Sequence, residues 1–255
     1  MAIAFAVVNQ KGGVGKTTTT VNLASYLASF GKKILLVDID AQSNASAGLG
    51  VDRSNLSLCL YNILIEGVNP QEAVLKSNIA NLDVLPSTPR LAGAEVELVS
   101  MDPRETRLKE ALATLKDQYD YLVIDCPPSL SLLTVNALTA ADEVIIPIQC
   151  EYYALEGISQ LTHTLELVRE SLNPSLKIRG IVLTMFDPRT LLSSQVADET
   201  RKYFGNKVFK TVIPRNVRLA EAPSFGQPIL FYDPGSKGAE AYENLCREVL
   251  DDNRI

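Results

Sequence analysis

The sequence predicts an α/β protein with a mostly parallel, twisted sheet and helices on both faces of the sheet. Short apolar runs alternate with helical patterns along the 255 residues, as they do where crossover helices join parallel strands. A glycine-rich segment lies between the first apolar run and the first helical pattern, and later apolar runs end in aspartate. In open α/β sheets, ligands bind at the edge of the sheet formed by the carboxyl ends of the strands. No linker interrupts the pattern, so residues 1–255 are expected to form a single domain.

The strands are expected where apolar residues run without alternation, because a strand covered on both faces buries both of its sides. We predict strands over residues 2–8, 32–38, 81–85, 119–125, 143–148, 177–184 and 207–213.

The helices are expected where apolar residues recur every three or four positions. In the first, over residues 17–30, Gly31 follows as a stop signal. Its apolar positions are Val21, Leu23, Ala24, Leu27 and Ala28. The other helices are predicted over residues 56–65, 103–116, 130–140, 155–172, 191–204 and 238–250. Residues 86–102 form the least regular stretch, which we interpret as an interface loop.

The segment between the first strand and the first helix has the composition of a phosphate-binding loop. Residues 11–17 read K-G-G-V-G-K-T, and Gln10 stands where the general pattern G-x-x-x-x-G-K-[ST] has its first glycine. Gly12 and Gly13 supply the backbone freedom that lets successive N–H groups cradle phosphate oxygens. We expect Lys16 to reach the β- and γ-phosphates of a nucleoside triphosphate and the Thr17 hydroxyl to ligate Mg²⁺.

Acidic residues follow two of the predicted strands at the same edge of the sheet. Asp38 and Asp40 end the second strand, and Asp125 ends the strand over residues 119–125. We predict that Asp40 holds or orients the attacking water and is a possible metal ligand, and that Asp125 holds Mg²⁺ through water. Asp38 is either structural or a neighbour of the metal, and both interpretations stay open.

Residues 149–153, which read Q-C-E-Y-Y, follow the strand over residues 143–148 at this edge as well. They are either an interface or switch segment or a plain loop that enters the next helix.

These motifs together resemble the ParA/Soj/MinD family of deviant-Walker P-loop ATPases, and most closely its Soj-type chromosome-partitioning members. The run I-P-R-N-V-R-L-A-E-A-P at residues 213–223 points to the Soj type. The matching stretches are residues 11–18, 37–42, 122–128, 147–157, 183–189 and 213–223.

The resemblance implies a P-loop NTPase fold and a slow, partner-stimulated ATPase that needs ATP and Mg²⁺. It makes Lys11 a signature lysine that crosses a dimer interface to the partner's ATP, so that a sandwich homodimer forms. Lys11, Lys16 and Asp40 are then the catalytic residues. The implied nucleotide contacts are Lys11, Gly12, Gly13, Val14, Gly15, Lys16, Thr17 and Thr18, with Pro214 and Asn216 at the base.

The type of base is also open to prediction. GTPase relatives carry an N/T-K-x-D signature, whereas residues 184–187 of this chain read T-M-F-D and lack the lysine. ATP is therefore favoured over GTP.

The distribution of charge predicts binding to DNA, although the net charge of −6 argues against it. Residues 201–218 contain six cations and no acid. A basic face of this kind binds the phosphate backbone without reading sequence. Family members bind DNA non-specifically as ATP dimers, together with a ParB-type adaptor. The predicted DNA contacts are Arg189, Lys202, Lys210 and Arg218.

Three other functions compete with partition of a chromosome or plasmid. A MinD-like division regulator would need a basic amphipathic tail, whereas residues 247–255 hold three acids and two arginines, so stable membrane binding is not expected. An iron-protein-like reductase would need interface cysteines, and the four cysteines are scattered. A ParA-like positioner of another cargo stays open. No run of 18 apolar residues occurs, so no transmembrane helix is expected. The scattered cysteines fit a reducing cytoplasm, and the resemblance implies association with the nucleoid there.

Overall fold

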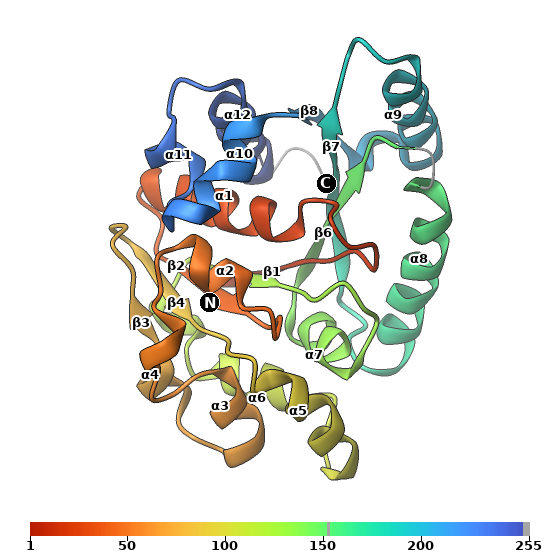
Figure 1. Ribbon diagram of the computed structural model, residues 1–255. Helices are drawn as coiled ribbons and strands as arrows, with labels where there is room; N and C mark the ends of the chain where they lie inside the picture. The colour runs from red at the N-terminus through yellow and green to blue at the C-terminus, as the bar shows by residue number, and fades with distance from the viewer. Residues whose placement is uncertain (152–153, 252–255) are drawn as a thin grey trace.

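The computed structural model describes residues 1–151 and 154–251, with side chains in the helix after residue 153 described from residue 160 onward. Eight strands form one sheet in the order β3-β4-β2-β5-β1-β6-β7-β8 (Figure 1). The short β3 pairs antiparallel with β4, and the other neighbouring strands pair in parallel. The strands are β1 Ile3–Val7, β2 Ile34–Asp38, β3 Leu75–Lys76, β4 Leu82–Leu85, β5 Tyr121–Asp125, β6 Glu143–Gln149, β7 Lys177–Phe186 and β8 Val208–Pro214.

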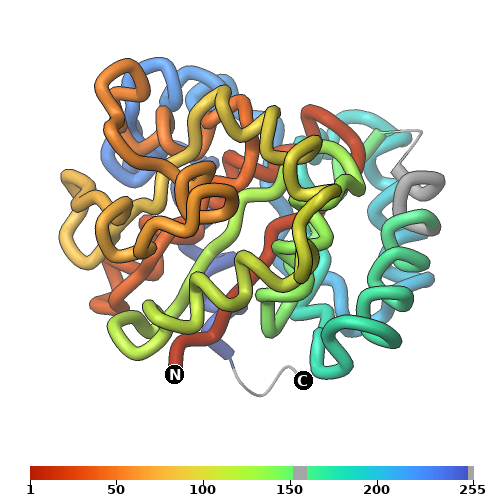
Figure 2. Tube along the Cα trace, turned by 90° about the horizontal axis from the view of Figure 1, so that it is seen from below, coloured from red at the N-terminus to blue at the C-terminus, as the bar shows by residue number. Residues whose placement is uncertain are grey.

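Helices cover both faces of the sheet, as the sequence predicts. One buried apolar cluster joins the sheet to α1, α2, α10, α11 and α12, and a second joins it to α3, α5, α6, α7, α8 and α9. Figure 2 shows the segment from α3 to α7 nearest to the viewer, seen from below. The helices are α1 Lys16–Ser29, α2 Asn44–Gly48, α3 Leu60–Glu66, α4 Pro70–Ala73, α5 Leu91–Glu97, α6 Arg107–Ala113, α7 Leu132–Ala140, α8 Ala154–Ser171, α9 Leu191–Phe204, α10 Val217–Glu221, α11 Ile229–Tyr232 and α12 Lys237–Leu250.

The stretch over residues 86–102 is more regular than the sequence predicts. It contains α5 and a following 3₁₀ turn, Leu98–Ser100. Leu91, Ala94 and Leu98 are fully buried against the sheet at helical spacing. The prediction of an irregular loop was therefore wrong for most of this stretch. The helical segment is so short that its apolar spacing does not stand out in the sequence without its packing partners.

The first helix is tied to the C-terminal part of the chain. The Thr19 and Tyr242 hydroxyl oxygens lie 3.1 Å apart, so α1 is hydrogen-bonded to α12 in a region where both side chains are buried. The Asn22 side-chain oxygen accepts a hydrogen bond of 2.8 Å from the Ile229 backbone N–H at the start of α11. The helix that begins at the glycine-rich loop is thus held in place by residues more than 200 positions away in sequence.

The strand order brings the predicted site residues to one edge of the sheet. β5 lies between β2 and β1, and Asp125 is the register partner of Asp38 on β2 and of Val7 on β1. The glycine-rich loop therefore leaves the sheet beside both acids. In the described part of the chain, no helix combines the length and apolar character needed to cross a membrane.

Candidate active site

The glycine-rich loop joins β1 to α1 and owes its shape to two glycines. Gly13 has φ of 73° and Gly15 has φ of 88°, a left-handed conformation that strains any residue with a Cβ atom. The Thr184 hydroxyl on β7 donates a hydrogen bond of 2.8 Å to the Val14 carbonyl and fixes the loop from the side. The loop is thus held in one conformation, and it leads directly into the N-terminus of α1.

Lys16 lies inside this loop with only 6% of its surface exposed. Its ammonium donates a hydrogen bond of 3.0 Å to the Lys11 carbonyl. Burial lowers the pKa of Lys16, and the negative charge of Asp125 opposes that shift. A desolvated ammonium whose acceptor is a neutral carbonyl is well suited to bind a phosphate oxygen, because an anionic acceptor forms the stronger hydrogen bond with it.

Asp125 lies at the end of β5 and is bound by two threonines of α1. The Thr17 hydroxyl donates to its Oδ2 at 2.7 Å, and the Thr20 hydroxyl donates to its Oδ1 at 2.8 Å. Burial, with a further contribution from the charge of Asp38, raises the pKa of Asp125 to about 8. A nearby cation would favour the ionised form of this carboxylate.

The two acids that follow β2 have different environments. Asp38 is fully buried, and its oxygens accept hydrogen bonds from Ser46 N–H at 2.8 Å, Ser46 Oγ at 2.7 Å and Asp40 N–H at 3.2 Å. Burial raises the pKa of Asp38 to about 6. Of the two interpretations left open for Asp38, this geometry favours the structural one, because its oxygens are used to hold the loop that carries Asp40.

Asp40 itself faces the glycine-rich loop. Its Oδ1 accepts a hydrogen bond of 2.9 Å from the Gln42 backbone N–H. The side chain lines a cavity of about 300 Å³ together with residues of the loop and Pro128. The other lining residues are Gly12, Gly13, Gly15, Lys16, Thr17, Thr18, Gln42, Asn44 and Met185. The cavity therefore brings Asp40 and the predicted phosphate contacts to one space.

A second cavity, of about 390 Å³, adjoins the first and contains the residues predicted to contact the base. Pro214 and Asn216 line it, and Gly15, Thr18 and Met185 line both cavities. Asn216 also begins α10, since its side-chain oxygen accepts a hydrogen bond of 2.8 Å from the Arg218 N–H. The contact of Pro214 and Asn216 with a base stays a prediction.

The donor set at the loop fits a nucleotide with Mg²⁺. Mg²⁺ prefers oxygen ligands and usually keeps several waters, with few ligands from the protein. The Thr17 hydroxyl and the Asp125 carboxylate supply such oxygens. Among the described residues no group of three or more His, Cys, Asp or Glu side chains is arranged to hold a metal ion. The site thus suits a metal that arrives with phosphates.

The Lys11 backbone is fixed at both its polar groups. Its N–H donates to the Asn9 side-chain oxygen at 3.0 Å, and its carbonyl accepts from Lys16. Asn9 in turn donates to the Pro147 carbonyl at 2.7 Å, which ties the loop to β6. Among the side chains of residues 1–151 and 160–251, the Lys11 ammonium has no ion-pair partner. Its role across a dimer interface stays a prediction.

The predicted DNA contacts lie on four segments, and the two arginines already have acidic partners. Arg189, in the loop after β7, forms two hydrogen bonds to Asp187 at 2.9 and 2.7 Å. Arg218 on α10 lies 2.9 Å from Glu221 and 3.3 Å from Asp233. The sequence window of six cations contains none of these acids, so the sequence alone gives no sign of the pairing.

The remaining two predicted DNA contacts, Lys202 on α9 and Lys210 on β8, are exposed. The four cations therefore do not lie on one element, and their contact with DNA stays a prediction.

Residues 149–153 are described only in part. Glu151 forms an ion pair of 2.9 Å with Arg215, which joins the end of β6 to the loop after β8. Tyr152 and Tyr153 lie outside the described residues, as do positions 252–255 of the C-terminal tail.

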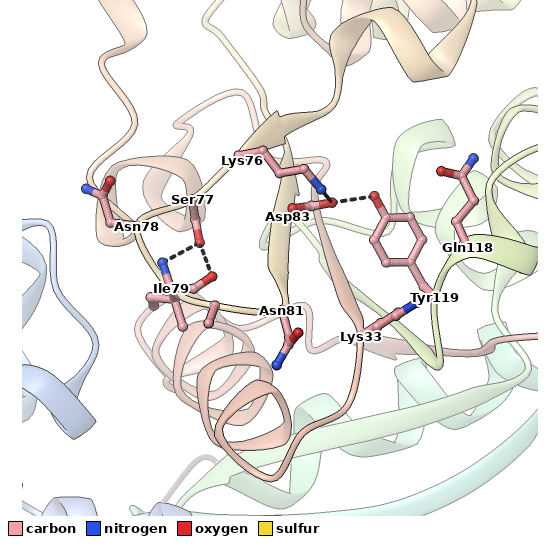
Figure 3. A pocket seen from close by; sticks show the side chains of 10 residues that line it. Lys33, Lys76, Ser77, Asn78, Ile79, Asn81, Asp83, Gln118 and Tyr119 are labelled. Carbon is pink, nitrogen blue, oxygen red and sulfur yellow. Dashed lines mark hydrogen bonds and ion pairs between the residues drawn. The ribbon is translucent and has the colours of Figure 1, made fainter.

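A larger cavity, of about 540 Å³, lies at the opposite edge of the sheet (Figure 3). It is lined by residues that precede the strands, such as Lys33 before β2 and Asn81 before β4. Its buried carboxylate, Asp83, is already engaged by the Lys76 ammonium at 2.6 Å and the Tyr119 hydroxyl at 2.8 Å. It contains no part of the glycine-rich loop, so its size does not make it the active site.

Comparison with known proteins agrees with the geometry of the loop. Residues 2–178 match the family described as AAA domain. The chain is 58% identical over 245 residues to the sporulation initiation inhibitor protein Soj of Bacillus subtilis (strain 168), with 96% of this chain and 97% of that protein covered. It is 56% identical over 246 residues to the chromosome partitioning protein ParA of Myxococcus xanthus (strain DK1622), with 96% and 87% covered.

A solved structure is similar over nearly the whole chain. The cobyrinic acid a,c-diamide synthase of Mycobacterium smegmatis, with bound ADP and magnesium, matches with a TM-score of 0.85 at 37% identity. The match covers 97% of this chain and 93% of that one.

Proposed function

The chain belongs to the ParA/Soj-type P-loop ATPases of the AAA domain family, and from this membership we propose that it is a partition ATPase which segregates a chromosome or plasmid with ATP and Mg²⁺. The observation that carries the proposal is the contact of 2.7 Å between the Thr17 hydroxyl and Asp125, beside a buried Lys16. A hydroxyl, a carboxylate and an ammonium at the start of a helix are the groups that hold a metal-bound triphosphate in P-loop enzymes. Mg²⁺ would neutralise the phosphates when bound.

The residues of the chain have separate tasks in this proposal. The loop N–H groups and Lys16 bind the phosphates, Thr17 contacts the metal, and Asp125 orients its water. Asp40, which lines the same cavity as Lys16 and Thr17, positions the attacking water. The base enters the adjoining cavity between Pro214 and Asn216.

Lys11 gives the nucleotide a second task, which is to join two copies of the chain. With its backbone fixed at the N–H and the carbonyl, the Lys11 side chain extends from a rigid support. A cation that reaches the partner's triphosphate makes ATP part of the interface, and a charge supplied in this way is worth roughly 10³–10⁵ in rate by analogy with arginine fingers. The basal rate is therefore slow until the adaptor stimulates it.

The ATP dimer is the form proposed to bind DNA and the ParB-type adaptor in the cytoplasm. Two copies double the number of phosphate contacts, and affinity for DNA rises steeply with that number. Arg189, Lys202, Lys210 and Arg218 are the proposed contacts. The two arginines would exchange their present acidic partners for phosphates.

The relatives favour partition over the alternatives. The names Soj and ParA belong to proteins that are 58% and 56% identical to this chain. The solved cobyrinic acid a,c-diamide synthase is 37% identical. A ParA-like positioner of another cargo would use the same ATP-dependent dimer and differ only in its adaptor.

The test is the molar mass by light scattering with ATP, with ADP and without nucleotide, each in Mg²⁺ and with or without non-specific DNA. We expect the chain to form a dimer with ATP but not with ADP or without nucleotide. A complex with DNA should likewise form only when ATP is present. The matched variant is Lys11→Ala, which should bind ATP and stay a monomer. If the Asp40→Ala chain, in which turnover is blocked, stays a monomer in saturating Mg-ATP, the proposal is contradicted.

A further inference from the structure

Asp125 is bound by a residue that the phosphate-loop motif does not contain. Thr20 lies one helical turn after Thr17, and a spacing of three residues puts both hydroxyls on the same face of α1. Each hydroxyl contacts a different oxygen of the carboxylate, Thr17 the Oδ2 and Thr20 the Oδ1. Both Thr20 and Asp125 are fully buried, so water does not compete for this contact.

The Thr20 hydroxyl has two possible acceptors, Asp125 and the Lys16 carbonyl, and the distances indicate which hydrogen bond is stronger. Its Oγ1 lies 3.0 Å from the Lys16 carbonyl, the bond that a helical threonine ordinarily makes four residues back. Other buried helical hydroxyls bind the carbonyl four residues before them more closely: Ser25 binds that of Val21 at 2.7 Å, and Thr200 binds that of Val196 at 2.7 Å. Thr20 is instead nearer to Asp125, at 2.8 Å, and this carboxyl is the stronger acceptor when a bound cation keeps it ionised.

From this geometry we infer that Thr20 is a positioning residue for the metal, acting through Asp125. Two hydroxyls on opposite oxygens fix the rotation of the carboxylate, so that Oδ2 stays turned toward Thr17. When the Thr17 oxygen ligates Mg²⁺, Thr20 is the contact that keeps Asp125 in place. The inference rests on the proposed function, because it concerns the same Mg²⁺ site.

The test compares variants that differ by one buried hydroxyl on α1. Thr20→Val removes the hydroxyl and keeps the shape, and Thr20→Ser keeps the hydroxyl. Thr19→Val is the matched control, because Thr19 is equally buried but its hydroxyl contacts Tyr242. The measurement is a titration of the ADP-bound chain with Mg²⁺, followed by the melting temperature. The value with ADP in EDTA is the reference, and the quantity compared is the Mg²⁺ concentration that gives half of the rise above it.

We expect Thr20→Val to raise the half-saturating Mg²⁺ concentration about tenfold or more, the usual cost of removing a group that orients a metal ligand. Its affinity for ADP in EDTA should match that of the wild type, because the loop N–H groups and Lys16, which bind the phosphates, are unchanged. Thr20→Ser and Thr19→Val should match the wild type in both measurements. If Thr20→Val does not fold, Thr20→Cys, with its weak S–H donor, replaces it and should show the same rise.

Two outcomes would overturn the inference. One is a half-saturating Mg²⁺ concentration in Thr20→Val equal to that of the wild type. The other is an equal rise in Thr19→Val, which would mean that any buried hydroxyl of α1 has this effect. If the wild-type chain itself gains no thermal stability from Mg²⁺ in the presence of ADP, the proposed function is contradicted. A failure of the proposed function is therefore distinguishable from a failure of the inference about Thr20.

Discussion

Lys16 is the side chain on which nucleotide affinity depends most directly. We predict that Lys16→Ala lowers the affinity for ATP about a hundredfold, since charge-assisted hydrogen bonds to phosphate are lost. The measurement is titration of the chain with ATP by calorimetry. Lys33→Ala, an exposed lysine at the other edge of the sheet, is the control and should bind ATP like the wild type. Equal affinities in the two variants would remove Lys16 from the phosphate site.

Asp40 is expected to affect turnover rather than binding. Asp40→Ala should slow ATP hydrolysis about 10²-fold or more, the usual contribution of a group that positions or deprotonates the nucleophile. ATP affinity should remain, so the ATP dimer should accumulate. Single-turnover hydrolysis and light scattering check this, with the exposed Asp117→Ala as control. A normal hydrolysis rate in Asp40→Ala would show that Asp40 does not position the attacking water.

At the scale of elements, Asp38 joins β2 to the loop before α2 and gives the nucleotide-free fold a pH dependence. Its pKa is raised to about 6 by burial, above the ordinary value near 4. The folded state therefore holds an extra proton between about pH 4 and pH 6. The contribution to stability is present below about pH 4 and is lost as the pH rises through about 6.

We predict that Asp38→Asn makes the loss of stability between pH 4 and pH 6 smaller by on the order of 2 kcal/mol. The variant is less stable overall, because an amide cannot accept the hydrogen bonds of Asp40 N–H and Ser46 on both of its ends. The slope between pH 6 and pH 8 should also become shallower, since the charge of Asp38 helps to raise the pKa of Asp125. Urea unfolding at each pH, with Asp117→Asn as control, measures this. Parallel curves for wild type and Asp38→Asn would contradict it.

The elements also show how far the sequence alone can be interpreted. The seven predicted strands are all present, because buried parallel strands are marked by uninterrupted apolar runs. The short elements α2, β3, α10 and α11 have too few residues for a period to be visible, and packing partners distant in the chain stabilise them. The glycine-rich loop was evident from composition. The contacts of Thr20 with Asp125 and of Ser46 with Asp38 were missed, since they depend on which strands are neighbours. The run of four threonines at residues 17–20 was the one signal that could have indicated the first of them.

At the scale of the whole molecule, binding to DNA is expected to depend on charge summed over two copies. Arg218→Glu should weaken the retention of non-specific DNA in ATP and lower the slope of log affinity against log salt by about 1 per protomer. Its acidic neighbours Glu221 and Asp233 would then repel phosphate as well. Lys33→Glu makes the same charge change at the other edge of the sheet and is the control. Light scattering should show that Arg218→Glu still forms the ATP dimer, and DNA retention equal to the control would contradict the assignment.

The apolar packing of α1 against α12 has a consequence for synthesis of the protein. Every residue proposed to contact phosphate or metal is made within the first half of the chain, yet the helix that supports them packs against α12. A nascent chain whose α12 has not yet left the ribosome therefore lacks the support that holds the loop. Premature termination products are expected to be inert toward nucleotide, so they cannot enter mixed dimers and block their full-length siblings.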